Sequence, residues 1–307
     1  MSSPSPPHHI ALLGGGTIGL SMLALHLRRP DTKVTLYDPR PDIETQLRES
    51  LPTFLTLPDT TPDTLQALWT SVAHSAPPTA HLWSSSSGIP ASQQAATAGP
   101  AVAARLLVVH PFNPPHLMPL IEIVPGPDTA LPRVDFVTEY FGAVPGPAGV
   151  RGASDAASKH YRPVVLGKEM PGFVGNRLAF ALLREAVYLV QEGVVSVRDL
   201  DKLMMASLGP RWAGSGVFES YHAGGGEGGI AAILEKLAPT IGEVWRDLGQ
   251  IDFSAGKGEG KESENEGWRD VVVRQTEEAY GPSVSVEERT KKGEMLRGVI
   301  DLQKQNL

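Results

Sequence analysis

The spacing of apolar and polar residues near the N-terminus predicts a strand, a tight turn, a helix and a second strand. Residues 9–13 form a short apolar run that ends at glycines, and residues 17–27 repeat apolar positions at helical spacing. A second apolar run follows at residues 33–37. This order is that of a β-α-β unit, the building block of a parallel sheet.

The pattern weakens in the next part of the chain and then returns. Between Asp38 and residue 106 the sequence is polar and rich in proline, with one helix-like segment at 64–72 and one strand pattern at 81–85. A loop rich in glycine and proline is expected at 125–132. Three further strand patterns are found at residues 106–109, 117–124 and 162–166.

The C-terminal half carries helical periodicity instead. Residues 170–193 predict a long helix that ends at Gly193, and Ser196 with Asp199 has the spacing of a capping box. The apolar stripe of this long helix consists of Val174, Leu178, Leu182, Ala186 and Val190. Further helices are expected at residues 197–207, 230–248 and 286–303, with a connecting loop at 221–229 and a mobile loop at 254–267.

These patterns predict an α/β fold. We expect a Rossmann-type, doubly wound parallel sheet in a domain of residues 1–168, followed by an all-helical domain of residues 169–307.

The composition excludes several classes of function. The 307 residues hold 34 acidic and 27 basic side chains, and the net charge of −7 would repel nucleic acid. Without cysteine there is no disulfide, thiolate metal site or cysteine nucleophile, and no other cluster has metal-ligand spacing. The sequence shows no leader, no membrane-spanning apolar run and no peroxisomal ending, so a cytosolic protein without membrane contact is expected.

A glycine-rich loop after the first strand predicts a dinucleotide site. Gly14, Gly16 and Gly19 form a G-x-G-x-x-G motif between a strand and a helix, and Thr17 and Ile18 complete the loop. The glycines allow the tight turn, the close approach of backbone to pyrophosphate and the packing of helix on strand. The helix N-terminus attracts the phosphate charge. A glycine turn without a ligand is the alternative interpretation.

The end of the second strand indicates which dinucleotide would bind. Asp38 lies there, where a carboxylate accepts hydrogen bonds from the ribose hydroxyls and repels a 2′-phosphate. Arg40 would favour NADP instead, but a charged loop residue is commonly just solvated. NAD is therefore the predicted cofactor.

A histidine and a glutamate on neighbouring strands predict acid-base chemistry. His110 ends an apolar run, and Glu122 shares a strand face with Leu120 and Val124, so its carboxylate needs a polar partner. Imidazole titrates near neutrality and can remove a hydroxyl proton, while a carboxylate on its other nitrogen fixes the tautomer. A histidine with a purely structural role is the alternative.

Three sequence motifs resemble the 3-hydroxyacyl-CoA dehydrogenase superfamily. The run HPFNPPHLMPLIEIVPG at 110–126 is similar to its signature, and PGFVGNRL at 171–178 to the start of its helical domain. The segments EGVVS, DLD and LGPRW between 192 and 212 resemble the branch that contains L-gulonate 3-dehydrogenase (lambda-crystallin) and carnitine dehydrogenase.

The resemblance implies an NAD-dependent dehydrogenase that oxidises a 3-hydroxyl group, and it implies a homodimer. It implies His110 as the base, Glu122 as the residue that orients it, and Ser87 and Asn176 as hydrogen-bonding partners of substrate or histidine. From the residues alone, the serines at 84–87 are a loop and Asn176 is a residue near a helix start.

The chain departs from the family between Asp38 and Ser84. Relatives place two more strands there, and this chain has room for too few, so the sheet is expected to lack at least one strand. Either the nucleotide site is remodelled or the sequence lacks a segment. The rival hypothesis is that the protein is a non-catalytic relative, which keeps the fold for a structural or binding role and has lost cofactor binding.

Two substrate classes remain open, a 3-hydroxyacyl-CoA thioester and a free 3-hydroxy acid. Arg211, beside Trp212, could hold a free carboxylate in a bidentate fork. A surface arginine in an ion pair is the alternative.

Overall fold

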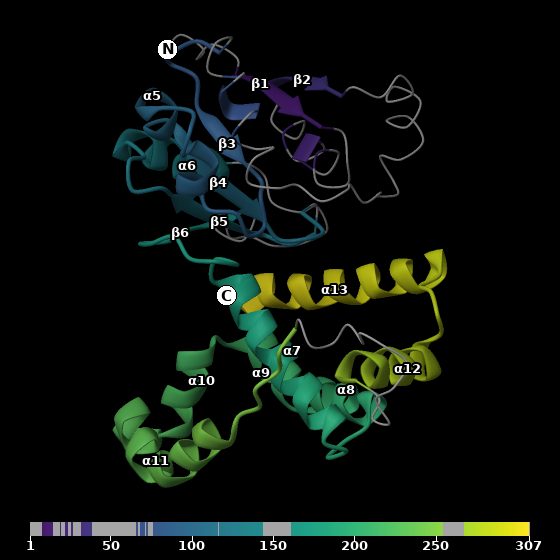
Figure 1. Cartoon of the computed structure of the whole chain (residues 1–307). Coiled ribbons are helices and arrows are strands. Elements are labelled where there is room, and N and C mark those ends of the chain that lie inside the picture. Colours follow the sequence, from purple (N-terminus) through teal and green to yellow (C-terminus); the bar gives the residue numbers. More distant parts are fainter. Residues whose placement is uncertain are drawn as a thin grey trace. The chain divides into compact units, whose positions relative to one another are not determined.

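The computed structural model describes residues 8–14, 19, 22–23, 26, 32–38, 66, 68–70, 72, 76–115, 117–143, 161–253 and 267–306 (Figure 1). The chain divides into two compact units, one formed by residues 1–176 and 296–307 and the other by residues 177–295. Every strand of the described residues belongs to the first unit, and the second unit is helical. The predicted class, an α/β Rossmann-type region followed by a helical part, is confirmed. The roles predicted for the two domains stay predictions.

The first two strands form a parallel pair, as the β-α-β pattern predicts. β1 (His8–Leu13) pairs with β2 (Thr32–Tyr37), and the described residues from 19 to 26, among them Gly19, Met22 and Leu23, are helical. The carboxyl ends of both strands therefore lie at one edge of the pair.

Four more strands form a second sheet in the order in which they occur along the chain, namely β3 (Leu82–Ser84), β4 (Leu106–Pro111), β5 (Leu120–Pro125) and β6 (Arg162–Val165). β3 and β4 are parallel, as are β5 and β6, but β4 and β5 are antiparallel. The connection at 112–119 is too short for a parallel crossover, which needs a dozen or more residues. The expectation of an entirely parallel sheet is thus corrected at this pair.

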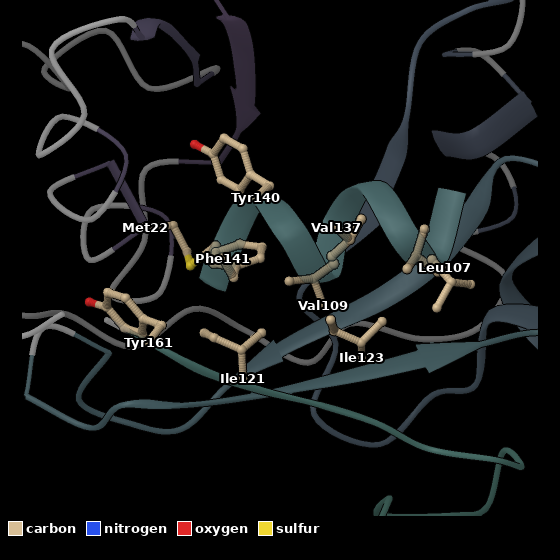
Figure 2. Packing of buried hydrophobic residues seen from close by; sticks show 10 residues of the cluster. Met22, Leu107, Val109, Ile121, Ile123, Val137, Tyr140, Phe141 and Tyr161 are labelled. Atoms are coloured by element: carbon tan, nitrogen blue, oxygen red, sulfur yellow. The ribbon is translucent and has the colours of Figure 1, made fainter. Parts of the chain in front are cut away.

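Helix α6 (Leu131–Ala143) covers one face of this sheet and forms the main core. Val137 and Phe141 of α6 pack on side chains of β4 and β5 (Figure 2). The side chains that the strands contribute are Leu107, Val109, Ile121 and Ile123. The opposite face of β4 packs with α4 (Ala91–Ala95) and α5 (Pro100–Ala103). β4 is buried along its whole length, which fixes the residue at its end, His110.

Helix α6 also contacts both sheets. The ring of His8 in β1 lies 5.8 Å from that of Tyr140, and the ring of Trp83 in β3 lies 5.4 Å from it. Within the described ranges, no strand hydrogen-bonds the β1–β2 pair to the four-stranded sheet. Residues 39–65, where the sequence predicts a missing strand, lie outside the described residues.

From Gly175 onward the described chain is helical, with the elements α7 (Gly175–Gln191), α8 (Val197–Ala206), α9 (Leu208–Gly214), α10 (Val217–Gly224), the 3-10 turn η2 (Gly226–Gly228), α11 (Gly229–Asp247), α12 (Trp268–Tyr280) and α13 (Val286–Asn306). The Ser196 side chain accepts a hydrogen bond from the Asp199 amide, which confirms the predicted cap of α8. None of the helices in the described parts of the chain is long and apolar enough to cross a bilayer.

Several sequence-based boundaries are wrong. The long helix begins at Gly175 rather than at residue 170, because Gly172 and Phe173 adopt left-handed conformations with φ of 73° and 52°. The segment 221–229 is no connecting loop, since α10 and η2 occupy most of it. Helices α4, α5, α6, α9 and α12 were not predicted. The loop expected at 254–267 falls almost entirely outside the described residues.

Candidate active site

His110 and Glu122 form a buried pair across two strands. They stand directly opposite each other in the antiparallel register of β4 and β5. His110 Nδ1 lies 2.7 Å from Glu122 Oε2, and the two side chains are 5% and 3% exposed. Residues opposite each other in an antiparallel pair share one face of the sheet, so the turn between the strands brings this pair together.

The second carboxylate oxygen of Glu122 is held by the start of α7. Oε1 accepts hydrogen bonds from the backbone amides of Val174, at 3.1 Å, and Gly175, at 2.9 Å. An ionised carboxylate only accepts hydrogen bonds, so the histidine donates from Nδ1. The Nε2 atom of His110 is then the nitrogen that can accept a proton.

Two phenylalanines flank the imidazole. The ring centroids of Phe112 and Phe173 each lie 5.4 Å from that of His110. Phe173 is fully buried, although its φ of 52° is uncommon outside glycine. Sequence reasoning assigned neither ring a role, although both lie in the motifs that carry the family resemblance.

The structure brings Ser87 and Asn176 together. The Asn176 side-chain amide donates to the Ser87 carbonyl at 2.9 Å, and Ser87 is exposed. The neighbouring serines shape the loop, because Ser84 and Ser86 accept hydrogen bonds from backbone amides two or three residues further on. Among the described residues, no hydrogen bond joins Ser87 or Asn176 to His110.

The described part of the glycine-rich loop fits a dinucleotide. Gly14, with a φ of 95°, donates its amide to the Tyr37 carbonyl at 2.8 Å and so ties the end of β1 to β2. A Cβ on Gly19 would lie 1.9 Å from the Gly14 carbonyl oxygen, so only glycine lets the helix approach the strand end. Asp38 follows β2 at the same edge.

The remaining predicted cofactor residues, Gly16, Thr17 and Ile18, lie outside the described residues, as does His116. Arg211 is exposed on α9, in the second unit, whereas His110 belongs to the first. Its predicted contact with a substrate carboxylate stays a prediction.

Fold and site together define an α/β nucleotide-binding protein with a buried histidine–glutamate pair and a helical C-terminal part. Residues 61–151 match the family model for the NAD binding domain of 3-hydroxyacyl-CoA dehydrogenase, and residues 172–257 match the model for its C-terminal domain. The chain is 33% identical to L-carnitine dehydrogenase of Streptomyces coelicolor over 282 residues, covering 81% of this chain and 83% of that protein. The chain therefore belongs to the 3-hydroxyacyl-CoA dehydrogenase family.

Other relatives agree with this assignment. L-carnitine dehydrogenase of Nocardiopsis dassonvillei is 29% identical, over 83% of this chain and 82% of that protein. Among solved structures, an NAD+ dependent dismutase, 5-formyl-3-hydroxy-2-methylpyridine 4-carboxylic acid 5-dehydrogenase, has the same fold with a TM-score of 0.70 at 23% identity, covering 98% of both chains. The predicted cofactor, NAD, and the predicted class of enzyme, a dehydrogenase, are confirmed.

Proposed function

We propose that the chain oxidises the 3-hydroxyl of a free 3-hydroxy acid of the carnitine type to a ketone, with NAD as cofactor and His110 as general base. The buried contact of 2.7 Å between His110 and Glu122 is the observation that carries this proposal. A hydroxyl proton must leave as hydride leaves the same carbon, and an oriented imidazole is suited to accept it.

Each residue of the pair has a separate task in this reaction. Nδ1 of His110 is engaged by Glu122, so Nε2 takes the proton from the substrate hydroxyl. Glu122 stabilises the imidazolium that forms, and the amides of Val174 and Gly175 keep the carboxylate in place. NAD, held by the loop from Gly14 to Gly19 and by Asp38, supplies the hydride acceptor when it is bound.

Two polar groups near the start of α7 would orient the hydroxyl. Asn176 and Ser87 already contact each other, and Ser87 has an exposed side chain that a substrate can reach. We assign them the hydrogen bonds that direct the hydroxyl toward Nε2 of His110.

The relatives support a free acid as substrate. Two L-carnitine dehydrogenases match more than four fifths of the chain, whereas a 3-hydroxyacyl-CoA dehydrogenase of Gibberella moniliformis, 38% identical, matches 53% of it. Arg211 is the candidate for binding the free carboxylate, because a guanidinium pairs with it through two parallel hydrogen bonds. The acyl-CoA thioester is the second candidate substrate.

Cofactor binding and turnover test the proposal. NAD binding is measured by calorimetry. Turnover is then measured as NADH formation with L-carnitine, L-gulonate and 3-hydroxybutyryl-CoA as substrates. His110→Ala should abolish turnover but leave NAD binding unchanged, and His9→Ala, at an exposed position of β1, is the matched control. A folded wild-type protein that binds no NAD would contradict the proposal and favour a relative that has kept only the fold.

We also assign the chain a homodimeric state. The second unit exposes many large apolar side chains, among them Phe180, Phe218 and Trp245 at 60%, 78% and 72%. Apolar area of this kind is commonly buried between subunits.

A further inference from the structure

Gly175 lies where the carboxylate of the pair, an aromatic ring and the start of α7 meet. Its amide donates to Glu122 Oε1 at 2.9 Å. A Cβ built on Gly175 would lie 1.9 Å from Cζ of Phe112, far closer than any real contact. The φ of Gly175 is not in the left-handed region, so the ring of Phe112, and not the backbone, excludes a side chain there.

Phe112 is in turn a neighbour of the imidazole. Its ring lies 5.4 Å from that of His110, inclined by 58°, and Phe173 lies at the same distance with an inclination of 57°. Phe112 is only partly buried, so its ring can move when it is pushed. A side chain at position 175 would therefore displace the ring that borders His110 before it unfolds the protein.

We infer that Gly175 is a positioning residue for the His110–Glu122 pair. It acts on Glu122 through its amide and on His110 through Phe112, for which its missing side chain leaves space. The inference rests on the proposed role of His110 as the base. A general base displaced by about 1 Å can lose roughly a hundredfold in rate, so a small shift of the ring should be visible in catalysis.

Four variants test this inference: Gly175→Ala, Phe112→Ala, the double variant, and the control Gly167→Ala. Gly167 is exposed, and a Cβ there meets nothing within 4 Å. Gly175→Ala should lower kcat by roughly tenfold to a hundredfold, with KM and NAD affinity within about twofold of wild type. The double variant should be no slower than Phe112→Ala, because the obstructing ring is gone.

Proton NMR of the purified protein gives a readout that does not need turnover. The Nδ1 proton shared with Glu122 should resonate far downfield in wild type and Gly167→Ala, and should shift or broaden in Gly175→Ala. Unchanged kcat and an unchanged resonance in Gly175→Ala would overturn the inference. A double variant whose loss of kcat equals the product of the losses in the two single variants would overturn it as well. If Gly175→Ala does not fold, the double variant is compared with Phe112→Ala by the same criteria. If wild type oxidises none of the substrates, the proposed function fails while the resonance still decides the role of Gly175.

Discussion

At the scale of single residues, both carboxylate oxygens of Glu122 are engaged in hydrogen bonds. One oxygen faces His110, and the other accepts two amides from the start of α7. A buried charge without such partners is costly, so the hydrogen bonds explain how a carboxylate that is 3% exposed persists in the core. The same hydrogen bonds fix the orientation of the Glu122 carboxylate relative to His110.

Glu122→Gln should therefore damage catalysis more than folding. The amide oxygen of glutamine would accept from Val174 and Gly175, which turns its NH2 group toward Nδ1 of His110. Nδ1 must then accept, and Nε2 carries the proton and cannot act as a base. By analogy with the replacement of the triad aspartate by asparagine in serine proteases, kcat should fall by up to about 10⁴. Steady-state kinetics checks this, with the exposed Glu139→Gln as control; activity near that of wild type would contradict it.

The lowered pKa of His81 makes the free energy of unfolding depend on pH. Burial, and then the Arg133 guanidinium, lower the pKa of His81 to about 4 from its ordinary 6.5. The ring stacks on Phe136 at 4.0 Å. Between pH 4 and pH 6.5 the unfolded chain binds more protons at His81 than the folded chain does. The free energy of unfolding that this group contributes is therefore fully present above pH 6.5 and is lost as the pH falls toward 4.

His81→Phe should remove this contribution. Urea unfolding at pH 7 and pH 5 should show a smaller loss of unfolding free energy on acidification in the variant than in wild type. His9→Gln, at an exposed position, should behave as wild type does. An equal loss in all three proteins would show that other groups carry the pH dependence.

At the scale of elements, α6 holds the sheet that carries the pair. Phe141 is fully buried against β4 and β5, and Val134 and Val137 lie on the same face of the helix. Because α6 shares a hydrophobic core with the strands that bear His110 and Glu122, loosening α6 should disturb the position of the pair.

Phe141→Ala should destabilise the protein by about 3–5 kcal/mol, because it leaves a cavity in a packed core. Leu131→Ala is the control on the same helix, since Leu131 is 75% exposed and its loss should cost less than about 0.5 kcal/mol. Urea titration followed by tryptophan fluorescence measures both. Equal costs for the two variants would mean that α6 is not part of the core.

At the scale of the whole molecule, the second unit exposes several large apolar side chains to solvent. On α7 alone, four large apolar side chains are more than 40% exposed, namely Leu178, Phe180, Leu182 and Leu183. Leu178 and Leu182 belong to the stripe that the sequence predicts, whereas Phe180 and Leu183 do not. Within that stripe only Val190 is buried.

Sedimentation velocity at micromolar concentration should give the mass of two chains. Phe180→Glu combined with Leu183→Glu should shift the protein to one chain, because charges buried in an apolar interface lack partners. Gln191→Glu adds a charge to an exposed position of the same helix and should leave the dimer intact. A wild-type protein that sediments as one chain would refute the assignment.

The sequence by itself determined the fold class, the cofactor and the candidates for the catalytic pair. Local rules are sufficient for these, because strand and helix periods, the glycines at 14 and 19 and the position of Asp38 act over a few residues. The capping of α8 by Ser196 and the approach of Gly19 to Gly14 are local in the same sense, and the structure has both.

The tertiary structure alone decided how the pair is held. The antiparallel turn from β4 to β5 depends on a short connection, and the amides that bind Glu122 come from a helix start more than fifty residues further along the chain. Helix α6 escaped prediction because its aromatic and β-branched residues have weak helix propensity, and packing on the sheet stabilises it. Contacts between distant segments leave no periodic signal in the sequence, which is why the role inferred for Gly175 could be recognised only in three dimensions.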